Sequence, residues 1–124
     1  MSIARIFKSC QCPKTVHTII EERYGKQILE GSKRWEVRLL RGKWISLFID
    51  DRLVLKFNNG KKTHLVRTIV RERDIFDTFE ELFNKTDVEE ILPGMEKNEA
   101  IAFYKQLYRD HANCKVVAFG VEPI

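Results

Sequence analysis

The segment Gly31–Arg38, with the sequence Gly-Ser-Lys-Arg-Trp-Glu-Val-Arg, holds most of the information in this chain. Gly31 is typical of a helix end, and after the turn apolar residues alternate with Glu36 and Arg38, which predicts a strand with one charged face. Lys33 lies at the turn between the two elements. The segment therefore joins a helix to a strand through an ammonium, a carboxylate and a guanidinium.

Two arrangements of these charges have different consequences. In a cleft, Lys33, Glu36 and Arg38 would bind a phosphate or the polar edge of a base, and a desolvated Lys33 would have a pKa low enough for general-base chemistry. On a solvent-facing strand the same residues form a surface ion pair that contributes little to stability. The spacing alone favours the solvent-facing arrangement.

Hydrophobic periodicity on both sides of this segment predicts a mixed fold. Strands are expected at residues 15–20, 35–40, 43–49, 52–57, 63–71 and 115–121. The first helix follows residue 20 directly, a second starts from a cap at Asp77 or Thr78, and a third starts from a cap at Asn98. The pair Asp50-Asp51 is expected to form a turn rather than a catalytic carboxylate pair, because adjacent strand residues point to opposite faces.

The length and composition favour one compact domain. The chain has 124 residues, of which 44% are hydrophobic and 32% charged, with six Gly and three Pro. The order of elements, mainly β with helical insertions, predicts an α+β fold built on a small β-barrel with flanking helices. Residues 1–14 are expected to form an N-terminal arm and residues 15–124 the domain.

The last helix carries an apolar stripe at helical spacing. Its expected members are Ile101, Tyr104, Leu107 and Tyr108. We expect this stripe to belong to the core rather than to a base-stacking platform. Trp35 and Trp44 flank the charged strand and are candidates for stacking on a base, but the alternation of Trp35 with Val37 favours burial in the core.

The charges are unevenly distributed along the chain. Between Lys33 and Arg73 twelve Lys or Arg face four Asp or Glu, which gives +8, whereas the remainder sums to −4. A clustered positive field attracts phosphates, so this stretch is a candidate nucleic-acid surface. Its candidate contact residues are Arg34, Arg41, Lys43, Lys61, Lys62, Arg67, Arg71 and Arg73. Solvated Lys and Arg on strands explain the same bias, and both interpretations stay open.

Other classes of site find little support. The chain has three Cys, and Cys10 and Cys12 are spaced too closely for the usual zinc arrangement with His17 and Cys114, so we expect ordinary thiols, no metal and no cofactor. The histidines show no ligand spacing, and no phosphate loop or nucleophile elbow is present. No apolar run reaches the length of a membrane span and no leader is evident. An intracellular location, cytoplasmic or nuclear, is expected.

Motifs along the chain resemble those of one family. Gly31-x-Lys33-x-x-Glu36-x-Arg38 resembles the GxKxxExR signature of the ASCH family, a group similar to the PUA RNA-binding domain. The likeness covers roughly Thr15 to Glu122 in the right order. Its further motifs are Asp51-x-Leu53-x-x-x-Phe57, Phe76–Leu82, Ile91-Leu92-Pro93 and Val116–Phe119.

The resemblance implies a PUA-like barrel whose cleft, between barrel and helices, is floored by Lys33, Glu36 and Arg38. It also implies RNA or modified-nucleoside binding. One bacterial branch hydrolyses N4-acetylcytidine with a Lys and a Thr of the signature and a distant Glu. Lys33 matches that Lys, whereas Glu36 stands in place of the Thr.

Three functions follow as hypotheses. The first is binding of RNA, single-stranded nucleic acid or a nucleoside, with Lys33, Glu36 and Arg38 as ligand-binding residues beside the basic surface. The second is hydrolysis of a modified nucleoside or of RNA, with Lys33 and Glu36 as catalytic residues. The third is a protein-interaction module that docks partners through its helical face. The sequence does not indicate an oligomeric state.

Overall fold

The computed structural model describes residues 12–124, so the anchors expected for the N-terminal arm lie outside the described residues. In chain order the elements, with 3-10 helices written η, are β1 (Thr15–Ile19), α2 (Glu22–Glu30), β2 (Trp35–Leu39), η1 (Gly42–Ser46), β3 (Arg52–Asn58), β4 (Thr63–Phe76), α3 (Phe79–Lys85), α4 (Val88–Ile91), α5 (Lys97–Leu107), η2 (His111–Asn113) and β5 (Val116–Pro123).

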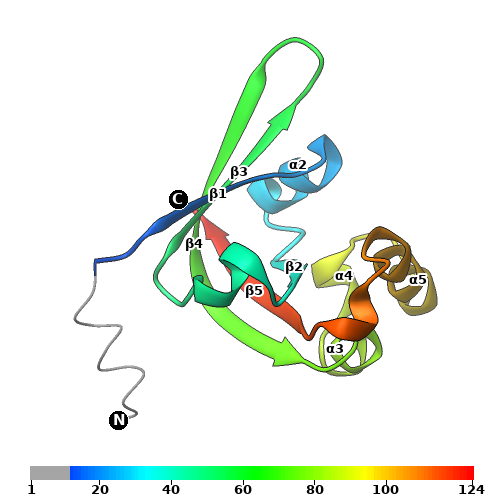
Figure 1. The fold of residues 1–124 in the computed structure, drawn as a ribbon. Helices are drawn as coiled ribbons and strands as arrows, with labels where there is room; N and C mark the ends of the chain where they lie inside the picture. The colour runs from blue at the N-terminus through cyan, green and yellow to red at the C-terminus, as the bar shows by residue number, and fades with distance from the viewer. Residues whose placement is uncertain (1–11) are drawn as a thin grey trace.

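The strands form one five-stranded sheet in the order β1-β3-β4-β5-β2. Only the pair β1 and β3 is parallel; the other neighbours are antiparallel. The sheet curls into a half-barrel, with α3, α4 and α5 gathered on one side and α2 near β3 (Figure 1). The predicted α+β class with flanking helices is confirmed.

A β-bulge divides the longest strand, β4. Val70 pairs with Val121 and Glu72 pairs with Gly120, so Arg71 is an extra residue without a partner on β5. Bulges bend a strand and redirect its side chains. The strand thereby continues to Phe76, beyond the end predicted at residue 71.

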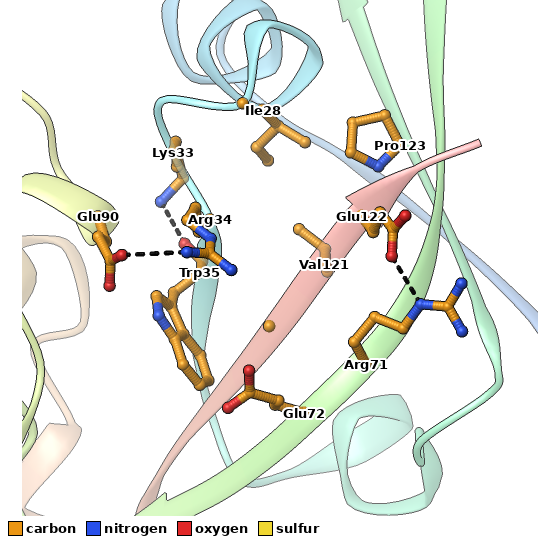
Figure 2. A pocket seen from close by; sticks show the side chains of 12 residues that line it. Ile28, Lys33, Arg34, Trp35, Arg71, Glu72, Glu90, Val121, Glu122 and Pro123 are labelled. Atoms are coloured by element: carbon orange, nitrogen blue, oxygen red, sulfur yellow. Dashed lines mark hydrogen bonds and ion pairs between the residues drawn. The ribbon is translucent and has the colours of Figure 1, made fainter.

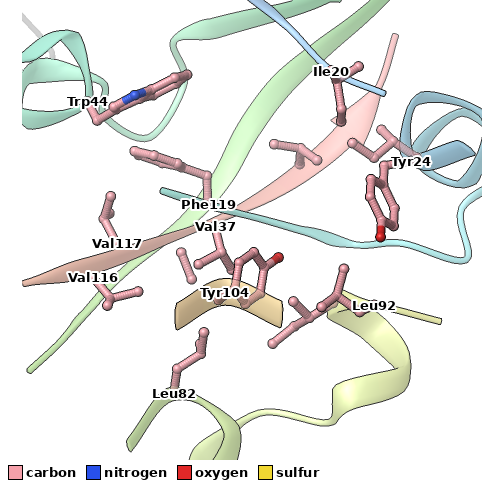
Figure 3. Packing of buried hydrophobic residues seen from close by; sticks show 14 of the residues in the cluster. Ile20, Tyr24, Val37, Trp44, Leu82, Leu92, Tyr104, Val116, Val117 and Phe119 are labelled. Atoms are coloured by element: carbon pink, nitrogen blue, oxygen red, sulfur yellow. The ribbon is translucent and has the colours of Figure 1, made fainter. Parts of the chain in front are cut away.

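The core lies between the sheet and the helices. Figure 3 shows Val37 and Val116 of the sheet packed near Tyr104 of α5 and Leu82 of α3, while Phe119 faces Trp44. The ring centres of Trp44 and Phe119 are 6.0 Å apart. Of the stripe expected on α5, Tyr104 is buried, but Leu107 is 56% exposed because the helix ends there, so its assignment to the core was wrong.

The strand predicted at residues 43–49 is also wrong. This region forms η1 and a loop, starting from Gly42 in a left-handed conformation with φ of 57°. Its carbonyl groups are not paired with a strand but accept hydrogen bonds from the Arg73 guanidinium, at 3.0 Å for Ile45 and 2.9 Å for Leu47. The Arg73 side chain of β4 thus supplies the hydrogen bonds that a neighbouring strand would otherwise give to these carbonyl groups.

The predicted turn at Asp50-Asp51 is confirmed, whereas the predicted helix cap at Asn98 is wrong. Asp50 and Asp51 form the expected turn, with Asp50 at φ 77° and the buried Asp51 carboxylate accepting from the Phe48 backbone N–H at 2.9 Å. The cap predicted at Asn98 is wrong, because α5 starts earlier, after Glu96. There the Glu99 carboxylate accepts from the Glu96 backbone N–H at 3.1 Å, which fixes the first turn.

Candidate functional site

The turn into β2 brings Lys33 back toward the helices. Gly31 adopts φ of 90° and its N–H donates to the Ile28 carbonyl at 3.1 Å, which ends α2. The Lys33 backbone N–H then donates to Gln27, and the Arg34 backbone N–H donates to Glu90 of α4 at 2.7 Å. The chain therefore enters β2 between two helices.

Lys33 is buried, with 2% of its surface exposed. Its Nζ donates to the carbonyl oxygens of Ile91 at 2.6 Å and Trp35 at 2.7 Å, and lies 3.7 Å from Glu36 Oε1. Glu36 is buried as well. The solvent-facing arrangement favoured by the spacing was therefore wrong, because α4 covers the start of β2 and supplies the Ile91 carbonyl.

Arg38 connects this buried pair to the surface. Its Nη2 donates to Glu36 Oε2 at 2.9 Å and to the Ile19 carbonyl at 3.4 Å. The guanidinium carbon lies 4.8 Å from the centre of the Trp44 ring, and 19% of the side chain is exposed. Its Nε is buried and has no hydrogen-bond partner among the described residues. Of the three charged groups, Arg38 is the one placed to meet a ligand.

Burial and charge act in opposite directions on the pKa values of this group. Burial, with a smaller contribution from Arg38, lowers the pKa of Lys33 below 10.5 despite the nearby Glu36 carboxylate. For Glu36, burial alone would raise the pKa, but the Arg38 guanidinium and the Lys33 ammonium outweigh it, and the pKa falls below 4.5. Glu36 is therefore ionised at neutral pH and holds Arg38 in place.

The basic residues predicted to bind nucleic acid do not form one continuous patch. Arg34 and Arg71 line the same pocket, and Lys43 lies 5.2 Å from the ring centre of Trp44, the ring that Arg38 also contacts. Lys61 and Lys62 lie in the turn between β3 and β4. The remaining three lie elsewhere: Arg73 donates to η1, Arg41 pairs with Asp110, and Arg67 is exposed on β4.

A pocket of about 460 Å³ lies on the opposite face of β2 from Glu36. We call it the Trp35 groove; Figure 2 shows Trp35, Glu72 and Arg71 around its open centre. Two ion pairs cross its rim, Arg34 with Glu90 at 3.3 Å and Arg71 with Glu122 at 2.7 Å. Glu72 has no ion pair with any described residue.

The two tryptophans exchange their expected roles. Trp44 is buried against Phe119, whereas Trp35 is half-buried and lines the groove. Alternation correctly placed Trp35 on the same face as Val37, but the helices cover that face only over Val37 and beyond.

Sequence reasoning missed Glu72 and Gly120 as part of this groove. Trp35 and Glu72 are both register partners of Gly120, so the three form one row across the sheet. The break in alternation at Arg71-Glu72 was the available signal, since a bulge shifts the face to which a side chain points.

Neither a metal nor a membrane site emerges from residues 12–124. In this part of the chain no group of three or more His, Cys, Asp or Glu is arranged to hold a metal ion, and no helix is long and apolar enough to cross a membrane. Cys10, one of the ligands considered, lies outside the described residues, while Cys12 and Cys114 have free thiols.

A curled five-stranded sheet with helices on one side, and under them the buried pair Lys33 and Glu36 joined to Arg38, defines an α+β half-barrel domain. The family model for the ASCH domain matches residues 19–124, and the chain belongs to that family. The resemblance inferred from the motifs is thereby confirmed.

Solved structures agree with this assignment. The crystal structure of hypothetical protein PH0355 is 28% identical with a TM-score of 0.76, covering 90% of this chain and 99% of that one. The NMR structure of PF0455 from Pyrococcus furiosus is 25% identical with a TM-score of 0.68, covering 89% and 97%. ASCH from Zymomonas mobilis, at 17% identity and a TM-score of 0.61 over 89% and 70%, shares the fold. No curated protein matches the chain.

Proposed function

We propose that the protein binds RNA or single-stranded nucleic acid, with one nucleotide held at Arg38, Lys43 and Trp44, which we call the Arg38 site. The observation that carries the proposal is the Arg38 guanidinium, which is anchored through Nη2 to Glu36 while 19% of the side chain stays exposed and Nη1 makes no hydrogen bond with a described residue. A planar fork with a free donor suits a phosphate or base oxygen.

The surroundings of Arg38 support an anionic ligand. Lys43 and Arg38 both lie within about 5 Å of the Trp44 ring centre, at 5.2 and 4.8 Å, so two cations share one aromatic side chain. The Glu36 carboxylate neutralises part of this charge, but it lies on the buried side of Arg38. The side open to a ligand is therefore positive, and a nucleic-acid strand that continues along β3 would meet Lys61 and Lys62 at the hairpin turn.

Binding is better supported than hydrolysis by the position of Lys33. Its Nζ already donates to two carbonyl oxygens and is enclosed by protein, so the ammonium does not reach the space beside Arg38. A general base must come within hydrogen-bond distance of the proton it removes. Lys33 acts instead as a positioning residue for Glu36.

The test is a binding panel of labelled single-stranded RNA, single-stranded DNA and duplex DNA, followed by fluorescence anisotropy at several salt concentrations. We expect single strands to bind, with affinity that falls steeply as salt rises, because phosphate contacts release counterions. Lys43→Gln should weaken binding several-fold and reduce the salt slope by about 0.7. Lys85→Gln, which removes an exposed lysine of α3, should bind as the wild type does.

A further variant separates charge from fold. Arg38→Gln removes the proposed ligand contact and leaves the buried Glu36 carboxylate paired with the Lys33 ammonium at 3.7 Å, so circular dichroism should show a folded protein that has lost most of its binding. Binding by Arg38→Gln at wild-type strength, or no binding of the wild type to any single strand at low salt, would overturn the proposal. Turnover of N4-acetylcytidine or RNA that disappears in Lys33→Arg would favour hydrolysis instead.

A further inference from the structure

We infer that the Trp35 groove is a separate site for a guanine base, presented by a nucleotide or by a single strand. The inference rests on the function proposed above for the class of ligand, and it assigns that ligand a second place on the molecule. Three features converge there: the half-buried indole of Trp35, the Glu72 carboxylate without an ion pair among the described residues, and a glycine that leaves the floor of the groove open.

The floor is formed by the row Trp35, Gly120 and Glu72 across three strands. A Cβ added to Gly120 would lie 3.0 Å from the Cβ of Glu72 and 3.4 Å from Cζ3 of Trp35. Gly120 has no left-handed backbone conformation that would call for glycine. Glycine is therefore required here for lack of space, because a side chain at this position would push the Trp35 ring and Glu72 apart.

The bulge at Arg71 supplies the polar side of the groove. Because Arg71 has no register partner, the strand turns both Arg71 and Glu72 toward the same face. Bulges beside binding sites commonly redirect side chains in this way. Figure 2 shows Glu72 extending toward Trp35, while the Arg71 guanidinium is turned away from Trp35 toward Glu122.

The arginines at the rim are free to change partners. Arg34 and Arg71 are each paired with a glutamate, and their side chains are 64% and 50% exposed. Exposed ion pairs contribute little free energy, so either guanidinium can leave its glutamate for a phosphate at small cost. A nucleotide would thus place its base on Trp35 and its phosphate near Arg71.

Glu72 selects the base. An ionised carboxylate only accepts hydrogen bonds, and its two oxygens suit two donors side by side. The Watson–Crick edge of guanine has such a pair, the N1–H and the N2 amino group. Adenine and cytosine place an acceptor beside their amino group, which would face the carboxylate with like partial charge. Stacking on Trp35 holds any base, whereas Glu72 favours guanine.

The two indole N–H signals of the full chain in a ¹⁵N-edited NMR spectrum provide the readout, because the protein has two tryptophans. Titration with GMP should shift the Trp35 signal, and a shift of the Trp44 signal in addition would report occupancy of the Arg38 site. GMP should bind about tenfold more tightly than AMP, CMP or UMP, the scale of one bidentate base contact. Glu72→Gln should remove this preference, while Asp74→Asn, two residues along the same strand, should keep it.

The source of the guanine is decided by a second pair of ligands. A pentanucleotide UUGUU that binds the groove more tightly than GMP indicates a strand, and the reverse indicates a free nucleotide; UUUUU should shift the Trp44 signal alone. Equal response to all four nucleotides, or an unchanged preference in Glu72→Gln, would overturn the inference. A Trp44 shift without a Trp35 shift would overturn it while supporting the Arg38 site, and the absence of both shifts would overturn both.

Discussion

The ammonium of Lys33 is solvated by the protein itself. Fully buried lysines are rare unless they are paired, and Lys33 bonds to two backbone carbonyls besides facing Glu36. One of these carbonyls belongs to β2 and the other to α4, so the side chain ties the helical layer to the edge of the sheet. Glu36 depends on this link, since it lies between the Lys33 and Arg38 cations.

The low pKa of Glu36 predicts a loss of stability in acid. Its carboxyl has a pKa below 4.5 in the folded protein and an ordinary value when unfolded, so unfolded chains bind more protons as the pH falls. The stabilisation is complete above pH 4.5 and is lost as the pH falls through the folded-state value. Urea unfolding between neutral pH and about pH 3.5 measures this loss.

The Glu36→Gln variant identifies the source of that loss. It should be less stable than the wild type at neutral pH, because the buried Lys33 and Arg38 lose their counter-charge, but its free energy of unfolding should fall less with acid. Asp74→Asn, which removes an exposed carboxylate, should keep the wild-type profile. Parallel profiles for Glu36→Gln and the wild type would show that Glu36 does not carry the effect.

The sequence identified the residues of the charged group but not their surroundings. Lys33, Glu36 and Arg38 are within one segment, so their spacing was enough to group them. The burial of Lys33 depends on the carbonyl of Ile91, which is 58 positions away in sequence. Alternation tells which residues share a face of a strand; which face is covered is decided by α4 and α5, and no local pattern contains that information.

At the scale of elements, α2 is held against the sheet through its one internal glycine. A Cβ at Gly25 would lie 2.5 Å from Cδ1 of Phe57 in β3 and 3.3 Å from Cγ2 of Ile20. Glycine is a poor helix former, so its presence inside α2 calls for a structural reason. The structure gives its reason: the backbone of α2 touches an aromatic ring.

The Gly25→Ala substitution should therefore destabilise the protein. Helix propensity alone predicts a gain of about 0.5–1 kcal/mol, but the contact with Phe57 predicts a net loss of about 1–3 kcal/mol from overpacking. Thermal or urea unfolding measures the difference. Leu29→Ala, an exposed position of the same helix, should change stability little.

A double variant attributes the loss to that contact. Phe57→Leu alone should destabilise, but in the Gly25→Ala background it should cost less, because the smaller side chain makes room for the new methyl group. Additive losses in the two backgrounds would indicate that the clash lies elsewhere.

Local pattern predicted most elements because each carries its own periodicity and ends. Residues 43–49 are the exception. Their apolar content resembles a strand, yet Trp44 turns into the core and Arg73 takes the carbonyl groups of the loop. Long-range hydrogen bonds from the Arg73 side chain override the strand propensity of this segment. The bulge at Arg71 was missed for a different reason, because strict alternation along a strand does not predict an extra residue.

On the scale of the whole molecule, the hairpin of β3 and β4 extends away from the helices (Figure 1). Its turn carries the exposed Lys61 and Lys62. A short ligand at the Arg38 site would not need these lysines, whereas a longer strand that follows β3 outward would reach them. We therefore expect the affinity at the proposed site to depend on the length of the nucleic acid.

Removing both lysines tests this dependence. Lys61→Gln with Lys62→Gln should leave the affinity for a pentanucleotide unchanged, but weaken binding of a long single strand and lower its salt slope by about 1.4, or 0.7 for each contact. Lys85→Gln with Lys97→Gln, on the helical side, serves as the matched control. Equal weakening for short and long strands would contradict the predicted path.

The edge position of β2 also orders events during synthesis. Within residues 12–124 its one neighbour in the sheet is β5, the last of the five strands in the chain, whereas β1, β3 and β4 pair without it. On the ribosome Glu36 and Arg38 emerge early and wait for their register partners Phe119 and Val117. The pairing that places Glu36 and Arg38 in the sheet, and with it the proposed Arg38 site, therefore forms only after β5 has been translated.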